Sequence, residues 1–472
     1  MVTARLFIDG TWVEGAERGT VEHKFTGEPL AELHHASADQ VAAAVAALVR
    51  GQATAGLGPR ERFSVLSRAA ELVGARRDEL RRTIVDETGF AHRDAEGEIN
   101  RAIETLRLSG EEAARLTGEM VPLEAAPGVQ RRIGYTMRVP VGVVAAITPF
   151  NSPLNTVCHK VGPALAAGNA VALKPSAYTP LTAELLVEIL LEAGLPTSLI
   201  ALVHGPGSQA GQALLIDERI GYYTFTGSTE VGRHIRATVG LRGAQLELGS
   251  LSSSLVCADA DVDTTVAKCA NAAFRKAGQV CTSVQRLYVH EDVADAFEAG
   301  LTAAAEALTC GDPRDPATEV GPLISEPEAE RVERWIERAA ERGARVLTGG
   351  TREGRVVRPT VLTDVDAAAE LMCRELFGPA VVIRRFEDLD EAIAEANDTP
   401  YGLAAGVFTR DLHRAFECVG RLHMGSVHIN ETSSSRIDLM PYGGVKDSGS
   451  GKEGPRYAIR EMTEERLVTI AY

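Results

Sequence analysis

The sequence lacks the features that mark secreted, membrane-spanning and nucleic-acid-binding proteins. Its N-terminus has no secretory h-region, and its longest apolar runs, such as Val141–Ile147, have only the length of a strand. Basic residues are in deficit, with 49 Lys plus Arg against 65 Asp plus Glu. The resulting formal net charge of −16 argues against a nucleic-acid surface. We therefore expect a soluble protein with no membrane and no nucleic-acid partner.

Cysteine is scarce as well. The seven cysteines are odd in number, and none of them forms a C-x-x-C pair. A chain of 472 residues builds cores large enough to need no disulfide staples. Reduced thiols in the cytoplasm are the better interpretation. Taken alone, each cysteine is more readily explained as a small buried hydrophobe than as a reactive group.

What the sequence does have is an ordinary globular composition, with 45% hydrophobic and 24% charged residues. Its length predicts two or three domains. A hairpin is expected at residues 6–13, around the Asp9-Gly10 turn. Short apolar runs then alternate with helical stretches, which is typical of βαβ units around a parallel sheet. We therefore predict two α/β domains that meet near residues 247–250.

The predicted elements form two series. In the first, helices are expected at 38–52, 59–86, 93–116, 154–167, 182–193, 209–216 and 229–238, and strands at 141–147, 170–174, 200–204 and 222–225. In the second, strands are expected at 254–257 and 286–289, and helices at 262–277, 293–308 and 328–342. Residues 119–139 are interpreted as a protruding two-stranded excursion, and 466–472 as a lone strand that needs a partner.

One cysteine stands apart because of its neighbours. Cys281 follows Gly278-Gln279-Val280 on a small-residue turn, and Glu247 lies 34 residues earlier in the chain. A thiolate can attack a carbonyl, and a carboxylate can later activate a water, so this pair suits an enzyme that forms a thioester. Asn151 follows a predicted strand, where its amide can donate to a developing oxyanion. An asparagine that only stabilises its own turn is the alternative.

Other strand ends carry residues suited to a dinucleotide. Lys174 ends a predicted strand and can donate to ribose hydroxyls, although a solvated lysine is the simpler alternative. Ser228 can cap a helix whose N-terminal amides would bind a pyrophosphate. No full G-x-G-x-x-G motif is present, so this fingerprint is weak by itself. Glu375 and Phe377 form an acid-aromatic turn that can face a ribose and a nicotinamide, with a plain structural turn as the alternative.

Seven motifs together resemble those of the NAD(P)-dependent aldehyde dehydrogenase superfamily. They are I-T-P-F-N at 147–151, L-K-P at 173–175, F-T-G-S at 225–228, L-E-L-G at 246–249, G-Q-V-C at 278–281, E-L-F-G-P at 375–379 and P-Y-G-G-V-K at 441–446. They occur in family order and span nearly the whole chain. The resemblance implies that Cys281 is the nucleophile, Glu247 the general base for deacylation and Asn151 an oxyanion donor.

The resemblance also implies a cofactor, NADP or NAD, and no metal. The residues expected to hold the cofactor are Thr148, Pro149, Lys174, Ser176, Ala177, Gly207, Phe225, Gly227, Ser228, Val231, Leu248, Glu375 and Phe377. Ala177 stands where the family often has a glutamate that binds the adenosine 2′-hydroxyl and repels a 2′-phosphate. NADP therefore becomes acceptable, with Lys174 available to pair with the phosphate, and the choice between NAD and NADP stays open.

The architecture implied by the resemblance is two Rossmann-like α/β domains plus a small β oligomerisation extension. Residues 1–118 and 141–248 would form the dinucleotide-binding domain, 249–447 the catalytic domain, and 119–140 with 455–472 the oligomerisation segment. We expect a homodimer or homotetramer, because the excursion and the C-terminal strand leave edges that call for pairing.

The predicted substrate tunnel is polar and partly cationic. The helix after Asn151 offers His159, the loop ahead of Pro441 carries Arg436, and Arg101 can reach the same mouth. Such a tunnel suits a short hydroxylated or anionic aldehyde. An ion pair of Arg436 with a nearby carboxylate, and a histidine satisfied within its helix, are the structural alternatives.

The run from Asn430 to Pro441 is most similar to the lactaldehyde and phosphonoacetaldehyde dehydrogenase branch. Aromatic aldehydes are the runner-up substrates. A dehydrogenase that acylates CoA is disfavoured because Glu247 is present. A catalytically silent structural relative is disfavoured because Cys281, Glu247 and Asn151 occur together.

Overall fold

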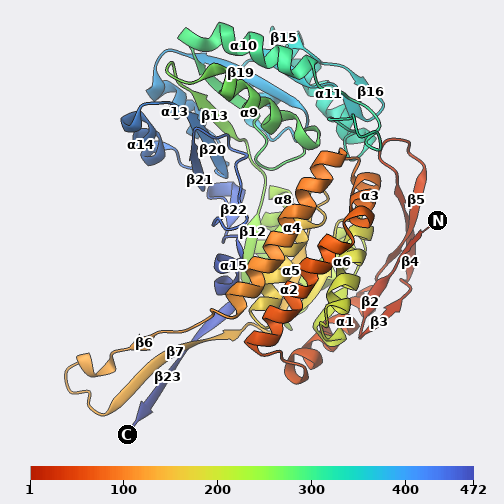
Figure 1. The fold of residues 1–472 in the computed structure, drawn as a ribbon, viewed down its shortest axis with the longest axis vertical. Helices are drawn as coiled ribbons and strands as arrows, with labels where there is room; N and C mark the ends of the chain where they lie inside the picture. Colours follow the sequence, from red (N-terminus) through yellow and green to blue (C-terminus); the bar gives the residue numbers. More distant parts are fainter. Residues whose placement is uncertain (1) are drawn as a thin grey trace.

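The computed structural model describes residues 2–472 and contains two Rossmann-like α/β domains and a projecting β extension (Figure 1). The first domain is built on an eight-stranded sheet of order β22-β12-β11-β8-β9-β10-β2-β3. Its strands are β2 (Leu6–Ile8), β3 (Thr11–Val13), β8 (Val143–Ile147), β9 (Ala170–Lys174), β10 (Ile200–Leu202), β11 (Ile220–Thr226), β12 (Gly243–Glu247) and β22 (Gly449–Ser450). The five central strands are parallel, and β2, β3 and β22 are antiparallel at the edges.

The helices of the first domain cover this sheet. They are α1 (Ala38–Thr54), α2 (Pro59–Ala75), α3 (Arg77–Thr88), α4 (His92–Ala113), α5 (Asn155–Ala166), α6 (Pro180–Glu192), α7 (Gln212–Ile216), α8 (Thr229–Val239) and α15 (Pro455–Glu461), with a π-helical turn at Gly207–Gly211 and a 3₁₀ turn at Thr197–Leu199. All five residues of β9 are buried. Continuous burial is expected of a parallel strand covered on both faces, and it explains why these strands are uninterrupted apolar runs in the sequence.

The second domain holds a seven-stranded sheet of order β15-β18-β19-β14-β13-β20-β21, in which only β15 is antiparallel to its neighbour. Its strands are β13 (Ser253–Val256), β14 (Arg286–His290), β15 (Arg345–Thr348), β18 (Thr360–Thr363), β19 (Ala380–Phe386), β20 (Ala404–Phe408) and β21 (Ser426–Ile429). The helices are α9 (Val262–Phe274), α10 (Glu291–Glu306), α11 (Glu326–Glu341), α12 (Glu370–Cys373), α13 (Leu389–Asn397) and α14 (Leu412–Arg421), with 3₁₀ turns at Arg275–Gly278 and Lys446–Ser448 and a hairpin of β16 (Arg352–Glu353) and β17 (Val356–Val357).

Two small sheets complete the fold. The extension consists of β6 (Met120–Val121), a 3₁₀ turn at Leu123–Ala125, β7 (Arg132–Pro140) and β23 (Thr463–Ala471), and it projects away from both domains with the C-terminus at its tip (Figure 1). The other sheet joins β1 (Val2–Ala4), β4 (Glu17–Glu22) and β5 (Pro29–His35) near the N-terminus.

The structure corrects three of the expected elements and adds one sheet that was not expected. The helix expected at 59–86 is two helices, because the chain breaks at Arg76 (φ −95°, ψ 21°). The C-terminal strand is not alone: all nine residues of β23 pair antiparallel with β7. Residues 455–462 do not belong to the extension, since Ala458, Ile459 and Met462 are buried in the core of the first domain. The sheet of β1, β4 and β5 was missed.

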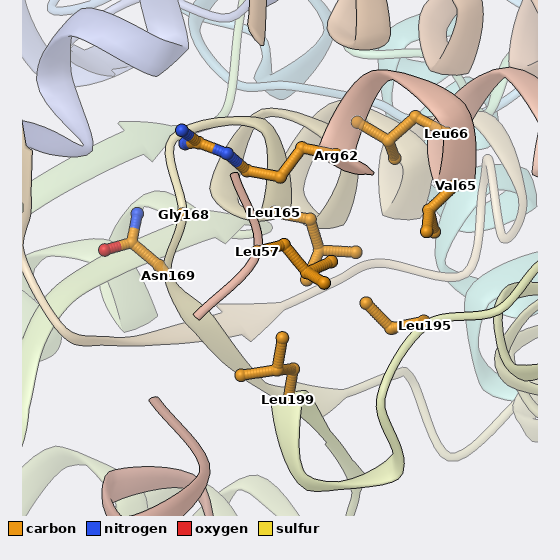
Figure 2. Close-up of a pocket in the computed structure, with 9 residues that line it drawn as sticks. All are labelled: Leu57, Arg62, Val65, Leu66, Leu165, Gly168, Asn169, Leu195 and Leu199. Atoms are coloured by element: carbon orange, nitrogen blue, oxygen red, sulfur yellow. The ribbon is translucent and has the colours of Figure 1, made fainter. Parts of the chain in front are cut away.

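A small void within the first domain is a packing feature away from the site described below. Figure 2 shows Leu57, Leu165, Leu195 and Leu199 around it, with Arg62 above them. The cavity measures only about 10 Å³. Arg62 donates from Nη1 to the carbonyl of Ala166 at 2.7 Å, so its charged head fastens α2 to the C-terminal end of α5. Apolar walls and this small size leave it no evident binding role.

None of the helices described for residues 2–472 combines the length and apolar character that crossing a bilayer requires. All seven cysteines in this part of the chain are free thiols.

Candidate active site

Cys281 lies just after a left-handed stretch of backbone. Lys276 and Ala277 both have φ 52°, and Gly278 has φ 71°. A Cβ on Gly278 would lie 2.1 Å from the carbonyl oxygen of Gly378, so only glycine fits there. Gln279 fixes the turn, because its side-chain amide donates to the Lys276 carbonyl at 3.1 Å and its Oε1 accepts from the Ile324 amide at 2.9 Å. The surrounding structure therefore holds a strained loop that presents the thiol.

Three functional groups meet at Cys281. Its Sγ lies 2.9 Å from the hydroxyl of Tyr442, and that hydroxyl donates to Oε1 of Glu247 at 3.3 Å. Glu247 is the last residue of β12, at the carboxyl edge of the parallel strands, where α/β sheets place their ligands. The next amide, Leu248 N–H, donates to the carbonyl of Ser448 at 3.0 Å, which fixes this strand end.

The environment raises the pKa of both the thiol and the carboxyl group. Burial and the nearby Glu247 carboxylate raise the pKa of Cys281 well above its ordinary value, although Tyr442 opposes this by donating to the thiolate. Burial, followed by the charge of Glu453, raises the pKa of Glu247 to about 7. A carboxylate with that pKa can accept a proton near neutral pH, which is what a general base must do.

Asn151 is held at the same place by a network that joins the two domains. Its amide Nδ2 donates to the Gln279 carbonyl at 2.9 Å, which leaves a second N–H hydrogen. Lys276 donates from Nζ to the Asn151 carbonyl and to Oε2 of Glu98, both at 2.8 Å. The other Glu98 oxygen accepts from the amides of Leu154 and Asn155 at the start of α5. A buried ion pair therefore fastens the asparagine loop to the cysteine loop.

A large cavity opens on one side of Cys281, with a volume of about 1010 Å³. All thirteen residues expected to hold the cofactor lie on its wall: Thr148, Pro149, Lys174, Ser176, Ala177, Gly207, Phe225, Gly227, Ser228, Val231, Leu248, Glu375 and Phe377. Asn151, Glu247 and Cys281 lie there too. Tyr178, Gln212 and His234 are also on this wall, and no sequence motif pointed to them.

The polar groups of this wall fit a dinucleotide. Ser228 caps α8, accepting from the Val231 amide at 3.4 Å, and the helix N-terminus provides further amides for a pyrophosphate. A Cβ on Gly227 would lie 2.5 Å from the ring of Phe225, so only glycine fits at this position. Close backbone approach beside a helix N-terminus is the usual way to hold phosphates in such folds.

Two ionisable groups lie on the cavity wall, Lys174, which is buried, and Glu375, which is partly buried. Lys174 makes one long hydrogen bond, 3.4 Å to the Pro175 carbonyl, and burial lowers its pKa to about 8. Glu375 accepts from the Ser250 amide at 3.0 Å, and burial raises its pKa to about 7. Both groups have unused hydrogen-bonding capacity toward the cavity, and ribose hydroxyls can both donate and accept.

A second, much smaller cavity of about 50 Å³ lies next to Cys281. Asn151, Thr226, Glu247 and Cys281 line both cavities, so the thiol lies where they meet. The remaining wall of the small cavity is polar: Arg101, Ser152, Asn155, Thr156, Arg275, Lys276, Val280, Thr282, Arg436 and Tyr442.

Of the three residues expected to contact substrate, two line the small cavity and one does not. Arg101 lies on the wall, and its Nε and Nη2 donate to the two oxygens of Asp438 at 3.2 and 2.8 Å. Arg436 also lies on the wall, in an ion pair with Glu453 at 2.7 Å and with its guanidinium 3.8 Å from the ring centre of Tyr442. The partner of Arg436 is therefore Glu453, and not a carboxylate close to it in sequence.

His159 does not line the small cavity, and its expected contact with substrate is not supported. The residue is only 1% exposed, and its Nε2 lies 2.8 Å from Oδ1 of Asp438 and 3.3 Å from Thr105 Oγ1. Burial lowers the pKa of His159, with the Arg436 charge acting in the same direction. It supports Asp438, which in turn holds Arg101.

Arg275 was missed from the sequence although it lies only six residues before Cys281. Its Nη2 donates to Ser434 Oγ at 2.7 Å. Within residues 2–472, no carboxylate oxygen lies within 4 Å of its guanidinium nitrogens, in contrast to Arg101 and Arg436. Burial lowers the pKa of Arg275, so an anion beside it would stabilise its charge.

The residues described include no group of three or more His, Cys, Asp or Glu side chains arranged to hold a metal ion.

Two Rossmann-like domains around a dinucleotide-sized cavity, with a thiol and a carboxyl group at its inner end, define the class of an NAD(P)-dependent oxidoreductase. The chain belongs to the aldehyde dehydrogenase family, whose sequence model matches residues 12–468. The resemblance inferred from the seven motifs is thus confirmed.

Individual relatives agree with this placement. The chain is 46% identical over 465 residues to a 3-sulfolactaldehyde dehydrogenase of Priestia aryabhattai, covering 98% of this chain and 97% of the relative. Its fold matches the crystal structure of aldehyde dehydrogenase 21 from Physcomitrella patens in complex with the reaction product succinate, with a TM-score of 0.96, 36% identity, and coverage of 100% and 98% of the two chains. It also matches an NADP-dependent glyceraldehyde-3-phosphate dehydrogenase from Bacillus halodurans complexed with NADP, with a TM-score of 0.97, 34% identity and full coverage of both chains.

Proposed function

We propose that this protein oxidises a short aldehyde with an anionic tail to the corresponding carboxylic acid, using NADP or NAD. The observation that carries the proposal is the small polar cavity beside Cys281, with three arginines on its wall. A volume of about 50 Å³ favours a substrate of only a few heavy atoms beyond the aldehyde. The alternative of an aromatic aldehyde is disfavoured by this size and by the polar wall.

Arg275 is the best candidate to bind the anionic tail. Arg101 and Arg436 are already neutralised by Asp438 and Glu453. Arg275 donates to the hydroxyl of Ser434 and forms no ion pair within 4 Å in residues 2–472, although the Asp94 carboxylate acts on it from farther away, so its guanidinium can bind a carboxylate, sulfonate or phosphonate. The names of two relatives support an anionic substrate: one acts on sulfolactaldehyde, and the other was crystallised with succinate as its product.

In the proposed reaction, the Cys281 thiolate attacks the aldehyde carbon while the free N–H of Asn151 stabilises the oxyanion. Lys174 and Glu375 would hold the dinucleotide, which would supply the acceptor for the hydride that the resulting adduct loses. This leaves a thioester on Cys281. Glu247 then removes a proton from a water that hydrolyses the thioester and frees the acid.

Both NADP and NAD fit this cavity. Ala177 lies on the wall close in sequence to Lys174 and offers no carboxylate to repel a 2′-phosphate. The buried ammonium of Lys174 can pair with that phosphate or donate to a 2′-hydroxyl. We therefore propose dual use, with NADP at least tolerated.

We also propose a homodimer or homotetramer that works in the cytoplasm. On the extension, Ile133, Met137 and Ile470 share one face of the β7–β23 ladder and are 41 to 47% exposed. The outer edge of β23 pairs with no other strand in residues 2–472, so it can accept a strand or loop from a second subunit. Seven free thiols fit a reducing compartment.

The test is a comparison of kcat/KM for anionic and neutral aldehydes. For succinic semialdehyde and phosphonoacetaldehyde, Arg275→Gln should lose about 10- to 150-fold, the value of a charge-assisted hydrogen bond. For propanal the loss should be small. Arg410→Gln is the control, because Arg410 is an exposed arginine paired with Asp261. Equal losses with anionic and neutral aldehydes would contradict the anion site, and a preference for benzaldehyde would favour the aromatic alternative.

A further inference from the structure

The hydroxyl of Tyr442 bridges the thiol and the carboxyl group of the site. It lies 2.9 Å from Cys281 Sγ and 3.3 Å from Glu247 Oε1. A phenol has one hydrogen, and an ionised carboxylate can only accept. When Tyr442 donates to Glu247, the thiol must therefore donate its hydrogen to the phenol oxygen. The resting arrangement is a directed chain from S–H through O–H to the carboxylate.

We propose that Tyr442 is a catalytic residue that relays the thiol proton to Glu247 and then stabilises the thiolate. The inference rests on the proposed role of Cys281 as nucleophile. In the relay, the phenol O–H bond breaks as its proton goes to Glu247, and the S–H bond breaks as its proton goes to the phenol oxygen. The products are a thiolate, a neutral carboxylic acid and an unchanged phenol, so protons and charge balance. Glu247 then releases this proton to solvent before the same carboxylate activates the water that hydrolyses the thioester.

After this transfer, the hydrogen on Tyr442 points at sulfur and no longer at the carboxyl group. The tyrosine thus becomes the hydrogen-bond donor that a buried thiolate needs, as expected from the rule that buried charges must be hydrogen-bonded. Without it, the thiolate would lose this donor, and once Glu247 ionised again it would face a carboxylate. Burial and this carboxylate already disfavour the thiolate, which agrees with the raised pKa of Cys281.

A cation on the face of the ring strengthens the donor. The Arg436 guanidinium lies 3.8 Å from the ring centre of Tyr442 and is held there by Glu453 at 2.7 Å. A positive charge over a phenol draws electron density from the oxygen, so its O–H becomes a better donor. The charged and titratable groups that face Tyr442 are Cys281, Glu247, Arg436 and, farther away, Arg275. Arg436 therefore acts as a positioning residue whether or not it also contacts substrate.

The experiment measures thiol reactivity without any aldehyde. The rate of Cys281 alkylation by iodoacetamide is followed from pH 5.5 to 10 by intact mass, with peptide mapping to identify the labelled thiol. Tyr442→Phe should slow alkylation at pH 7 by about tenfold or more and move its midpoint to higher pH, because one hydrogen bond to a charged group is lost. The same variant should lose a similar factor in kcat/KM for every aldehyde, while cofactor affinity stays unchanged.

Tyr288→Phe is the matched control. Tyr288 is fully buried, and its hydroxyl has no hydrogen-bond partner, so removing this oxygen breaks nothing. Its alkylation profile should coincide with that of the wild type. An alkylation profile of Tyr442→Phe within twofold of the wild type would overturn the relay. The proposed function would stand in that case, since its own tests are the aldehyde panel with Arg275→Gln and the loss of aldehyde oxidation in Cys281→Ala.

The relay can still be tested if Tyr442→Phe destabilises the fold. If Tyr442→Phe melts at a markedly lower temperature, Tyr442→Ala is assayed with added phenol and, separately, with benzene. Faster alkylation with phenol but not with benzene supports the relay, because only phenol restores the hydroxyl. No difference between the two additives overturns it.

Discussion

Replacing Glu247 by glutamine should make the protein more stable and stop its catalytic cycle at the thioester. Burial and the Glu453 charge raise the pKa of this carboxyl group from 4.5 to about 7. The folded state therefore holds the proton more tightly than the unfolded state, and folded stability falls as pH rises between these two values. With 1.36 kcal/mol for each pH unit, the ionised carboxylate costs the folded state about 3 kcal/mol above pH 7. Glutamine keeps the shape without that cost.

The assay has two readouts. Melting temperatures of Glu247→Gln and wild type are compared at pH 5 and pH 8, and the variant should gain markedly more at pH 8. Intact mass after mixing with cofactor and aldehyde should reveal an acyl group that forms more slowly than in the wild type, because Tyr442 has lost its proton acceptor, and that then stays on Cys281. In the wild type, any deacylation-limited rate should fall about tenfold for each pH unit below 7, because only the ionised base works.

Glu184 provides the control. Burial also raises its pKa to about 7, and it accepts from the Arg5 amide at 3.3 Å, away from both cavities. Glu184→Gln should be stabilised with the same pH dependence and yet deacylate normally. If Glu247→Gln turns over at the wild-type rate with no acyl adduct, the base has been misassigned. If acyl-CoA forms when CoA is added, thiolysis has replaced hydrolysis.

Two further outcomes are expected. Ala177→Glu should raise KM for NADP by tenfold or more while sparing NAD, because the new carboxylate would repel the 2′-phosphate. Such a like-charge contact costs about 1–3 kcal/mol. Unchanged NADP kinetics would show that residue 177 does not face the 2′ group. Ile133→Asp with Ile470→Asp should reduce the mass seen by light scattering, because both residues lie on the exposed apolar face of the extension; a fully active wild-type monomer at micromolar concentration would contradict the proposed oligomer.

The backbone conformation of the site could be predicted from the sequence, because it depends on residues that are neighbours in the chain. Sequence motifs located the strand ends, the cap at Ser228 and the glycine turn before Cys281, because each of these is determined by residues adjacent in the chain. The supports of the site could not be found this way. Glu98 reaches Lys276 across 178 residues, and Tyr442 reaches Cys281 across 161. No local pattern encodes which distant side chains will meet.

The same reason explains the errors. For Arg436, the structural alternative was an ion pair with a carboxylate near it in sequence; an ion pair does form, but its partner Glu453 lies on another segment. His159 was expected to face the substrate because of its position on the helix, but its Nε2 contacts Asp438 and the residue does not line the small cavity. The helix break at Arg76 has no glycine or proline at the breaking residue to announce it.

The pairing of β7 with β23 also constrains how the chain can fold as it is made. Residues 132–140 leave the ribosome more than 300 residues before their partner at 463–471 exists. The first sheet likewise waits for β22, and its core waits for α15. An early α/β unit thus spends most of synthesis with an open edge and an uncovered apolar face, the condition in which chains aggregate or recruit chaperones. The subunit assembly that we propose through the extension would likewise have to wait until β23 has been made.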